Sequence, residues 1–236
     1  MKPYISEWPV QQFYDGKVKD AKTFNDKEGE SLKPLSLHGH QAAYCWLQIV
    51  GTERKDDNGS TYNQAEAEAV VSLLQQLSES GDPSWNSSEK IRVITFYQAQ
   101  VNYIRLLLRK YNVQDVTVST VDSSQGCEAD IVILSFVRGT SGHVGFLKDD
   151  RRLNVALTRA KSQLICIGNL DAIVGLDAKG GNLVVKEMAT DAMKRDSVKV
   201  FEADSLPHPR FEEIVPPSMA PSKRTNAQKK KRNQKS

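Results

Sequence analysis

The chain has 236 residues, 39% hydrophobic and 26% charged, which suits one domain with a buried core and a tail. No run approaches the roughly 20 apolar residues of a membrane span, and the first residues lack the apolar stretch of a secretion signal. The net charge is +3, but residues 221–236 hold seven basic residues and no acidic one, and subtracting these seven charges leaves the rest at about −4. Nucleic-acid binding by this mildly acidic body would therefore need a local groove.

Extended and helical segments alternate along the chain. Residues 1–37 are predicted to be irregular, and the apolar run 42–50 is predicted to be a buried strand closed by Gly51. A polar loop at 56–59 follows. The segment 64–80 has apolar residues at helical spacing and is predicted to be an amphipathic helix.

The same strand-and-helix unit then recurs. Strands are predicted over 91–96, 116–121, 131–137, 163–168 and 198–201, and helices over 97–111, 151–162 and 186–195. Strands that are apolar along their length are typical of a parallel sheet covered on both faces. The sequence therefore predicts an α/β fold with an irregular lead-in at 1–40, a domain at 41–203 and a disordered basic tail at 204–236.

Three polar segments lie where strands end or a helix begins. They span 95–100, 119–128 and 149–152. Ligands of open parallel sheets bind at the carboxyl ends of the strands, where loops converge. These segments are therefore the first candidates for a binding site.

The third segment leads into the predicted helix with Arg152 and Arg159. At this spacing the two arginines share a helix face, and a rigidly held guanidinium suits a phosphate because it donates in bidentate geometry and keeps its charge. The pattern also fits a solvated basic face paired with Asp149, Asp150 and Glu128. Spacing alone favours this second interpretation.

The remaining candidate features are less specific. Gly126 permits either a close backbone approach to a ligand or a turn with positive φ. The hydroxyls of Thr120, Ser123 and Ser124 can hold phosphates or cap a turn. No His or Cys spacing indicates a metal site, and the three cysteines are predicted to be reduced core thiols.

Several runs resemble motifs of a known family. Residues 119–139 (STVDSSQGCEADIVILSFVRG) resemble motif V of superfamily-one helicases, and residues 142–169 (GHVGFLKDDRRLNVALTRAKSQLICIGN) resemble motif VI. Residues 94–108 and 60–74 resemble the motif IV region and the segment before it. The chain is thus similar to the DNA2/NAM7-like group, with its nonsense-mediated-decay and senataxin-like helicases. Residues 4–18 resemble the segment just after the group's arginine-methionine-histidine-proline motif, which implies that the domain starts upstream.

The resemblance implies the second of two RecA-like domains, a P-loop NTPase-type helicase domain 2. The family binds ATP with Mg²⁺ between its two domains. This sequence contains no GxxxxGK[ST] motif, so we expect ATP binding only when a first RecA-like domain completes the site. By resemblance, Arg159 is the arginine finger, and Gly126, Glu128 and Arg152 belong to the nucleotide side. Glu128 is expected near the ribose, and Arg152 is expected to orient its helix through a carboxylate.

The resemblance also implies contacts with single-stranded RNA or DNA. The residues concerned are Thr95, Tyr97 and Gln100 of motif IV and Thr120, Asp122 and Ser123 of motif V. The expected function is the second motor domain of an ATP-dependent helicase, inactive without its partner domain. The alternative is a non-catalytic nucleic-acid-binding or regulatory module. A nuclear or cytoplasmic protein is expected, and the basic tail favours the nucleus.

Overall fold

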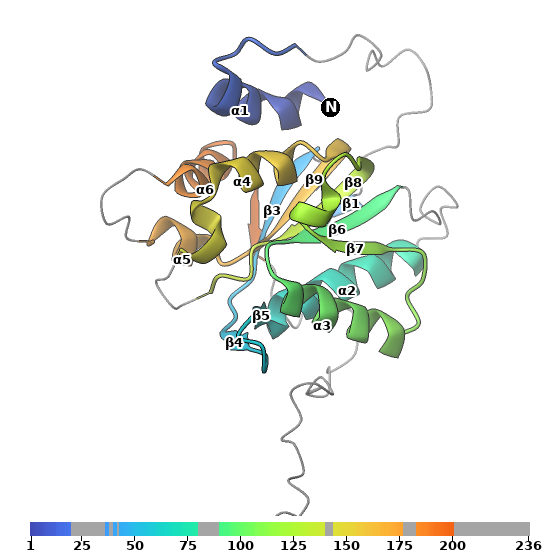
Figure 1. Ribbon diagram of the computed structural model, residues 1–236. Helices are drawn as coiled ribbons and strands as arrows, with labels where there is room; N and C mark the ends of the chain where they lie inside the picture. The colour runs from blue at the N-terminus through green and yellow to red at the C-terminus, as the bar shows by residue number, and fades with distance from the viewer. Residues whose placement is uncertain are drawn as a thin grey trace, which may run out of the picture.

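The central strands carry apolar side chains on both of their faces. All five residues of β3 (Tyr44–Gln48) are buried, and so is every residue of β8 (Ala129–Ser135) except Asp130. Such strands must lie in a sheet that is covered on both sides. The computed structural model, which describes residues 1–19, 36–37, 40–41, 43–79, 90–139, 144–176 and 183–200, has this three-layer arrangement (Figure 1).

The sheet has six parallel strands in the order β10–β3–β9–β8–β6–β7. The four strands not yet delimited are β6 (Ile91–Thr95), β7 (Thr117–Thr120), β9 (Ala160–Gly168) and β10 (Val198–Val200). Two short antiparallel pairs lie outside this sheet, β1 (Ser36–Leu37) with β2 (His40–Gln41) and β4 (Glu53–Lys55) with β5 (Thr61–Asn63). The predicted parallel α/β fold is confirmed.

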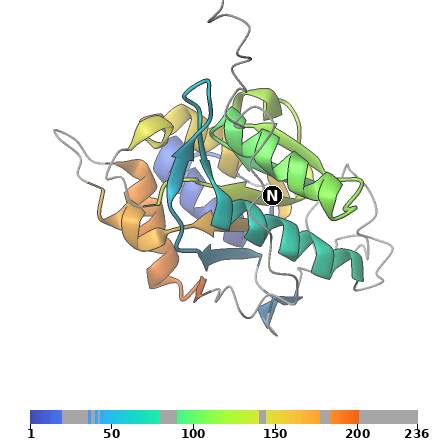
Figure 2. The same ribbon diagram turned by 90° about the horizontal axis from the view of Figure 1, so that it is seen from below.

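Helices cover both faces of the sheet (Figures 1 and 2). One face packs against α2 (Gln64–Glu79) and α3 (Gln98–Lys110). The other packs against α1 (Pro3–Tyr14), α4 (Asp150–Leu157), α5 (Leu170–Val174) and α6 (Val184–Lys194). Two 3-10 helices, η3 (Asp122–Ser124) and η4 (Gly145–Lys148), lie in the connections that precede β8 and α4. No helix among the described residues is long and apolar enough to cross a membrane.

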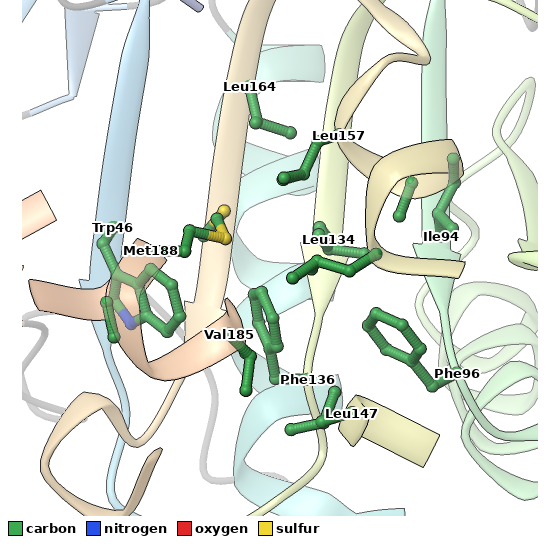
Figure 3. Close-up of a cluster of buried hydrophobic side chains, with 14 of the residues drawn as sticks. Trp46, Ile94, Phe96, Leu134, Phe136, Leu147, Leu157, Leu164, Val185 and Met188 are labelled. Carbon is green, nitrogen blue, oxygen red and sulfur yellow. The ribbon is translucent and has the colours of Figure 1, made fainter. Parts of the chain in front are cut away.

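Two separate apolar clusters fill the space between these layers. Successive residues of β8 alternate between them, so Ile133 packs on the α2–α3 side and Leu134 on the α4–α6 side. Figure 3 shows the second cluster, in which the Trp46 and Phe136 rings stack with centroids 4.7 Å apart. Cys45 and Cys166 are free thiols buried in these clusters, and the free Cys127 is half-buried in a loop. The predicted core position is therefore confirmed for two of the three cysteines.

The prediction that residues 1–37 are irregular is wrong for α1. Pro3 lies in the first turn, where the missing N–H costs no hydrogen bond, and Ile5 and Pro9 are buried against the domain. Arg195 pairs with the Glu7 carboxylate at 3.0 Å, and its guanidinium lies over the Tyr4 ring. These partners are remote in sequence, so no local pattern indicates the helix. The predicted tail at 204–236 lies outside the described residues.

The predicted helix over 151–162 is also too long. Helix α4 ends at Leu157, Thr158 and Arg159 form a turn, and β9 begins at Ala160. Ala160 pairs with Ala129 of β8, and the Ala129 N–H donates to the Arg159 carbonyl at 3.0 Å. The residues from Ala160 onward therefore join the sheet because they pair with β8, although their local propensity is helical. The polar loop at 56–59 is the turn of the β4–β5 hairpin, which the sequence reading missed.

Candidate functional site

A groove of about 1000 Å³ lies at the carboxyl ends of β6, β7 and β8. Its walls come from the β4–β5 hairpin, the segments that follow β6 and β8, the end of β7 and η3, and the η4–α4 region. The lining residues are Glu53, Arg54, Lys55, Asn58, Gly59, Ser60, Thr61, Phe96, Tyr97, Gln98, Thr120, Asp122, Arg138, Gly145, Phe146, Lys148 and Arg152. Five of these are basic and two are acidic. A groove with excess positive charge and one exposed aromatic ring, that of Phe146, suits a single-stranded nucleic acid.

Arg138 is held rigidly on the groove wall. Its guanidinium pairs with the Glu53 carboxylate at 2.5 Å, and its Nε donates to the Tyr97 hydroxyl at 2.8 Å. The Tyr97 hydroxyl also accepts from the Phe146 N–H at 3.2 Å. Burial raises the pKa of Tyr97, so the hydroxyl stays neutral at physiological pH. Tyr97, which the sequence assigned to the single strand, therefore lies in the groove and organises its neighbours.

A buried polar network holds the backbone just before Arg138. Val137 has φ of +71°, which is unusual for a β-branched residue. Its N–H donates to Glu66 Oε2 at 2.8 Å, and its carbonyl accepts from Asn63 Nδ2 at 3.2 Å. The Ser135 hydroxyl also donates to Glu66 Oε2, at 2.7 Å. Side chains on α2 and β5 thereby fix the direction in which the chain leaves β8.

Gln100 belongs to this network and not to the groove surface. It is fully buried, its Oε1 accepts from the Asn63 N–H at 2.8 Å, and its Nε2 donates to the Ser135 hydroxyl at 3.1 Å. Thr95 is likewise fully buried in β6. Neither side chain can touch a strand in the groove. Their assignment to the single strand rested on motif position, which does not report burial, and it stays a prediction that burial does not favour.

The motif V residues at the groove are partly used within the protein. The Thr120 and Ser123 hydroxyls lie 3.0 Å apart, and Thr120 Oγ1 accepts from the Ser123 N–H at 3.3 Å, so Thr120 ties η3 to the end of β7. Asp122 accepts two bonds from Arg152, at 3.0 and 2.9 Å. The expected carboxylate partner of Arg152 is thus Asp122. Arg152 and Asp122 both line the groove.

A second group of candidate residues lies at the other end of the parallel strands, next to the amino ends of β8 and β9. Gly126 has φ of +78°, and open space surrounds the position that a Cβ would take. Glu128 is exposed, with its carboxylate 3.9 Å from the Lys161 ammonium. Arg159 follows α4 and directs one guanidinium nitrogen toward the Cys127 carbonyl at 3.5 Å. The parallel pairing of β8 with β9 brings these two motifs together.

Arg159 is half-buried, and main-chain and hydroxyl oxygens hold its guanidinium. Its Nε donates to the Val155 carbonyl at 2.9 Å and its Nη2 to the Thr158 hydroxyl at 3.0 Å. None of these acceptors is a carboxylate, so its positive charge is not neutralised by a direct ion pair among the described residues. An arginine has five N–H donors, and Arg159 makes three hydrogen bonds, to the carbonyls of Val155 and Cys127 and to the Thr158 hydroxyl. Donors therefore remain for an anionic ligand.

Helix α4 connects the two groups. Arg152 in its first turn reaches Asp122 at the groove, and Arg159 just beyond its last residue lies beside the Gly126–Glu128 loop. An eight-residue helix is about 12 Å long at about 1.5 Å per residue. Of the residues expected at the nucleotide, Gly126, Glu128 and Arg159 lie together, whereas Arg152 lies at the groove with Tyr97, Thr120 and Asp122.

The basic and aromatic residues that complete the groove were not among the residues predicted from the sequence, and they are Lys55, Arg138, Phe146 and Lys148. The Asp-Asn-Gly turn at 57–59 between short β-prone segments is a hairpin signal that could have located Lys55. No local signal marks Arg138, because its position depends on the distant residues Glu53 and Glu66. The described residues contain no group of three or more His, Cys, Asp or Glu side chains arranged for a metal ion.

Comparison with known proteins shows the family to which the chain belongs. Residues 1–171 match the family model of the AAA domain. The chain is 34% identical to Helicase sen1 of Schizosaccharomyces pombe over 210 residues, which cover 87% of this chain and 12% of that protein. It is 38% identical over 185 residues to the uncharacterized ATP-dependent helicase MJ0104 of Methanocaldococcus jannaschii, covering 72% of this chain and 25% of the relative.

A third relative is similar to the chain over a comparable stretch. The Regulator of nonsense transcripts 1 of Caenorhabditis elegans is 34% identical over 185 residues, which cover 75% of this chain and 17% of that protein. The chain therefore spans between 12% and 25% of the length of these three relatives. The resemblance seen in motifs IV, V and VI is confirmed, and the chain belongs to the AAA domain family as a Sen1- and Upf1-like superfamily-one helicase domain.

Proposed function

We propose that this domain is the second motor domain of an ATP-dependent superfamily-one helicase. The observation that carries the proposal is the position of helix α4. It joins a basic groove at the carboxyl ends of the strands to Arg159 at their amino ends, an arginine with no carboxylate partner among the described residues. A motor must couple a change at its nucleotide to a change in its grip on a strand. One short rigid helix that touches both places can transmit a displacement between them.

The groove would hold single-stranded RNA or DNA. Lys55 and Lys148 are exposed and supply charge for phosphates, and the Ser123 hydroxyl can donate to a phosphate oxygen. Tyr97 and Thr120 line the same groove, and Arg152 and Asp122 shape it as an ion pair. Contacts of this kind to phosphate and sugar carry little base information, so we expect binding with weak sequence preference.

The residues at the amino ends of β8 and β9 would complete an ATP site. Arg159 would extend from its main-chain acceptors toward the γ-phosphate and stabilise the charge that develops on it in the transition state. The open backbone at Gly126 would let the nucleotide approach, and Glu128 would accept from a ribose hydroxyl. These residues fit one side of a nucleotide. We propose that a first RecA-like domain supplies the phosphate loop and Mg²⁺, and that this chain alone does not hydrolyse ATP.

The test is the ATPase activity of this chain joined to the first RecA-like domain of a relative, measured with and without poly-U. We expect stimulation by poly-U and a loss of turnover number of about a thousandfold in Arg159→Ala. Strand binding without nucleotide should be unchanged in this variant. Arg151→Ala, which removes an exposed arginine of the same segment, is the matched control and should keep its activity.

Two results would change the assignment. If Arg159→Ala retains full turnover in an active chimaera, Arg159 is not the finger. If every chimaera is inert while the isolated chain binds single strands, the domain is a non-catalytic nucleic-acid-binding or regulatory module.

We also propose a location in the nucleus or cytoplasm, with residues 221–236 favouring the nucleus because of their seven positive charges. A fluorescent fusion with and without these residues tests this. Equal nuclear fractions would assign the tail no targeting role.

A further inference from the structure

Phe146 is an aromatic side chain exposed within the basic groove. Its exposed fraction is 47%, whereas Phe96, Phe136 and Tyr97 are all buried. The neighbouring Leu147 is fully buried in the core cluster of Figure 3 and anchors η4 to the domain. The 3-10 helix therefore fixes Phe146 on the groove side by burying the next residue. An isolated exposed phenylalanine needs no functional explanation, but this ring has a constructed environment.

The backbone beneath Phe146 is packed too tightly for an ordinary residue before it. Gly145 has φ of +56°, and a Cβ at this position would clash with Arg138 Nη2 and with the Tyr97 hydroxyl. The Phe146 N–H donates to that same hydroxyl at 3.2 Å. The Tyr97 ring lies 5.2 Å from the Phe146 ring, centroid to centroid. Glycine thus allows η4 to lie directly on the Arg138–Tyr97 pair, which supports the exposed ring.

A cation lies against the Phe146 ring, and a second basic side chain lines the same groove. The Arg152 guanidinium is 4.7 Å from the Phe146 centroid and is itself fixed by two bonds to Asp122. Lys148, two residues further along η4, is exposed and lines the same groove. An aromatic ring backed by arginine, in a groove that a lysine also lines, presents a stacking surface for a base and charge for its phosphate.

We propose that Phe146 stacks on a nucleobase of the bound single strand, with Arg152 and Tyr97 holding the ring in place. The inference rests on the proposed strand-binding function and adds a base contact to a groove otherwise equipped for phosphates. Because every base has a π face, the contact adds affinity without sequence preference.

The test measures anisotropy of two fluorescently labelled single strands bound to the full chain. One is oligo-U, and the other has the same number of phosphates but abasic sugars. We expect oligo-U to bind more tightly than the abasic strand. Phe146→Ala and Phe146→Leu should each raise the Kd for oligo-U by at least about fivefold and leave the Kd for the abasic strand unchanged. Phe146→Trp should retain tight binding of oligo-U, since it restores the π face.

Lys148→Ala is the matched control for a phosphate contact. It should weaken both strands equally and reduce the slope of log K against log salt by about 0.7, whereas Phe146→Ala should leave that slope unchanged. The stacking proposal is overturned if oligo-U and the abasic strand bind equally, or if Phe146→Ala weakens them by the same factor. If the wild-type chain binds neither strand at low salt, the strand-binding function itself is wrong.

Discussion

A single buried carboxyl group, Glu66, controls how the chain leaves β8 toward the groove. Its oxygens accept from the Ser135 hydroxyl, the Val137 N–H and the Asn63 amide, at 2.7, 2.8 and 3.4 Å. Burial raises the pKa of Glu66 to about 8, although the bonds from Ser135 and Val137 lower it. The same contacts that hold Val137 at positive φ thus surround a group that resists ionisation.

The raised pKa of Glu66 makes stability depend on pH. Because the folded-state pKa of about 8 exceeds the usual value of 4.5, the folded chain binds more protons between these values. The contribution is therefore fully present below pH 4.5 and is lost as pH rises toward 8. Within this window the free energy of unfolding should fall by up to about 1.4 kcal/mol per pH unit.

Urea unfolding of wild type and Glu66→Gln from pH 5 to 9 checks this dependence. The variant should show a flatter profile between pH 5 and 8, whatever its absolute stability. Glu128→Gln, which changes an exposed carboxyl group, should keep the wild-type profile. Parallel profiles for wild type and Glu66→Gln would show that Glu66 does not titrate in this range.

Among the elements, α4 begins at a capping residue, Asp149, that also fixes the backbone of the groove residue Arg152. The Asp149 carboxylate accepts from the N–H groups of Arg151 and Arg152, at 3.1 and 3.3 Å. These donors would otherwise lack a partner within the helix. The cap therefore fixes the start of the helix that positions Arg152 at one end and Arg159 at the other.

Removing this cap should destabilise the domain measurably. Asp149→Ala should lower the free energy of unfolding by about 1 kcal/mol, and Asp149→Asn should restore most of it because the amide oxygen can also accept. Chemical denaturation measures both values. Asp57→Ala, at an exposed position of the β4–β5 turn, is the control and should stay near wild type. Equal stabilities of Asp149→Ala and Asp149→Asn would mean that the cap contributes nothing.

Considered as a whole, the molecule buries its sheet from both sides. Ile133 and Leu134 are adjacent in β8, are both fully buried and belong to different apolar clusters. In a sheet with one solvated face, one of two adjacent residues would face water. The two residues therefore report separately on the α2–α3 layer and on the α4–α6 layer.

Truncating either residue should be costly. Ile133→Ala and Leu134→Ala should each lower the free energy of unfolding by about 2 to 5 kcal/mol, because each leaves a cavity in a packed layer. Val50→Ala, at a position 72% exposed, should change it by less than about 0.5 kcal/mol. The midpoints of urea unfolding supply the comparison. A small effect at only one of the two β8 positions would mean that the corresponding helical layer is loosely packed.

The sequence by itself determined the α/β class, the central strands and the two long helices of the α2–α3 layer. These follow from local hydrophobic periodicity, as in the apolar run 131–137 and the stripe of Val101, Ile104, Leu107 and Leu108. The resemblance to motifs V and VI placed Gly126, Glu128, Arg152 and Arg159 on the nucleotide side, and the pairing of β8 with β9 brings the first two and Arg159 together.

Only the tertiary structure decided which polar residues face the groove. Gln100 and Tyr97 are three residues apart in one motif, yet Gln100 is enclosed by Asn63 and Ser135 while Tyr97 lines the groove. Arg138 and Phe146 reach the groove through Glu53, Glu66 and Gly145, all remote or unmarked in the sequence. Burial and side-chain direction depend on contacts between distant segments, and local periodicity carries no information about such contacts.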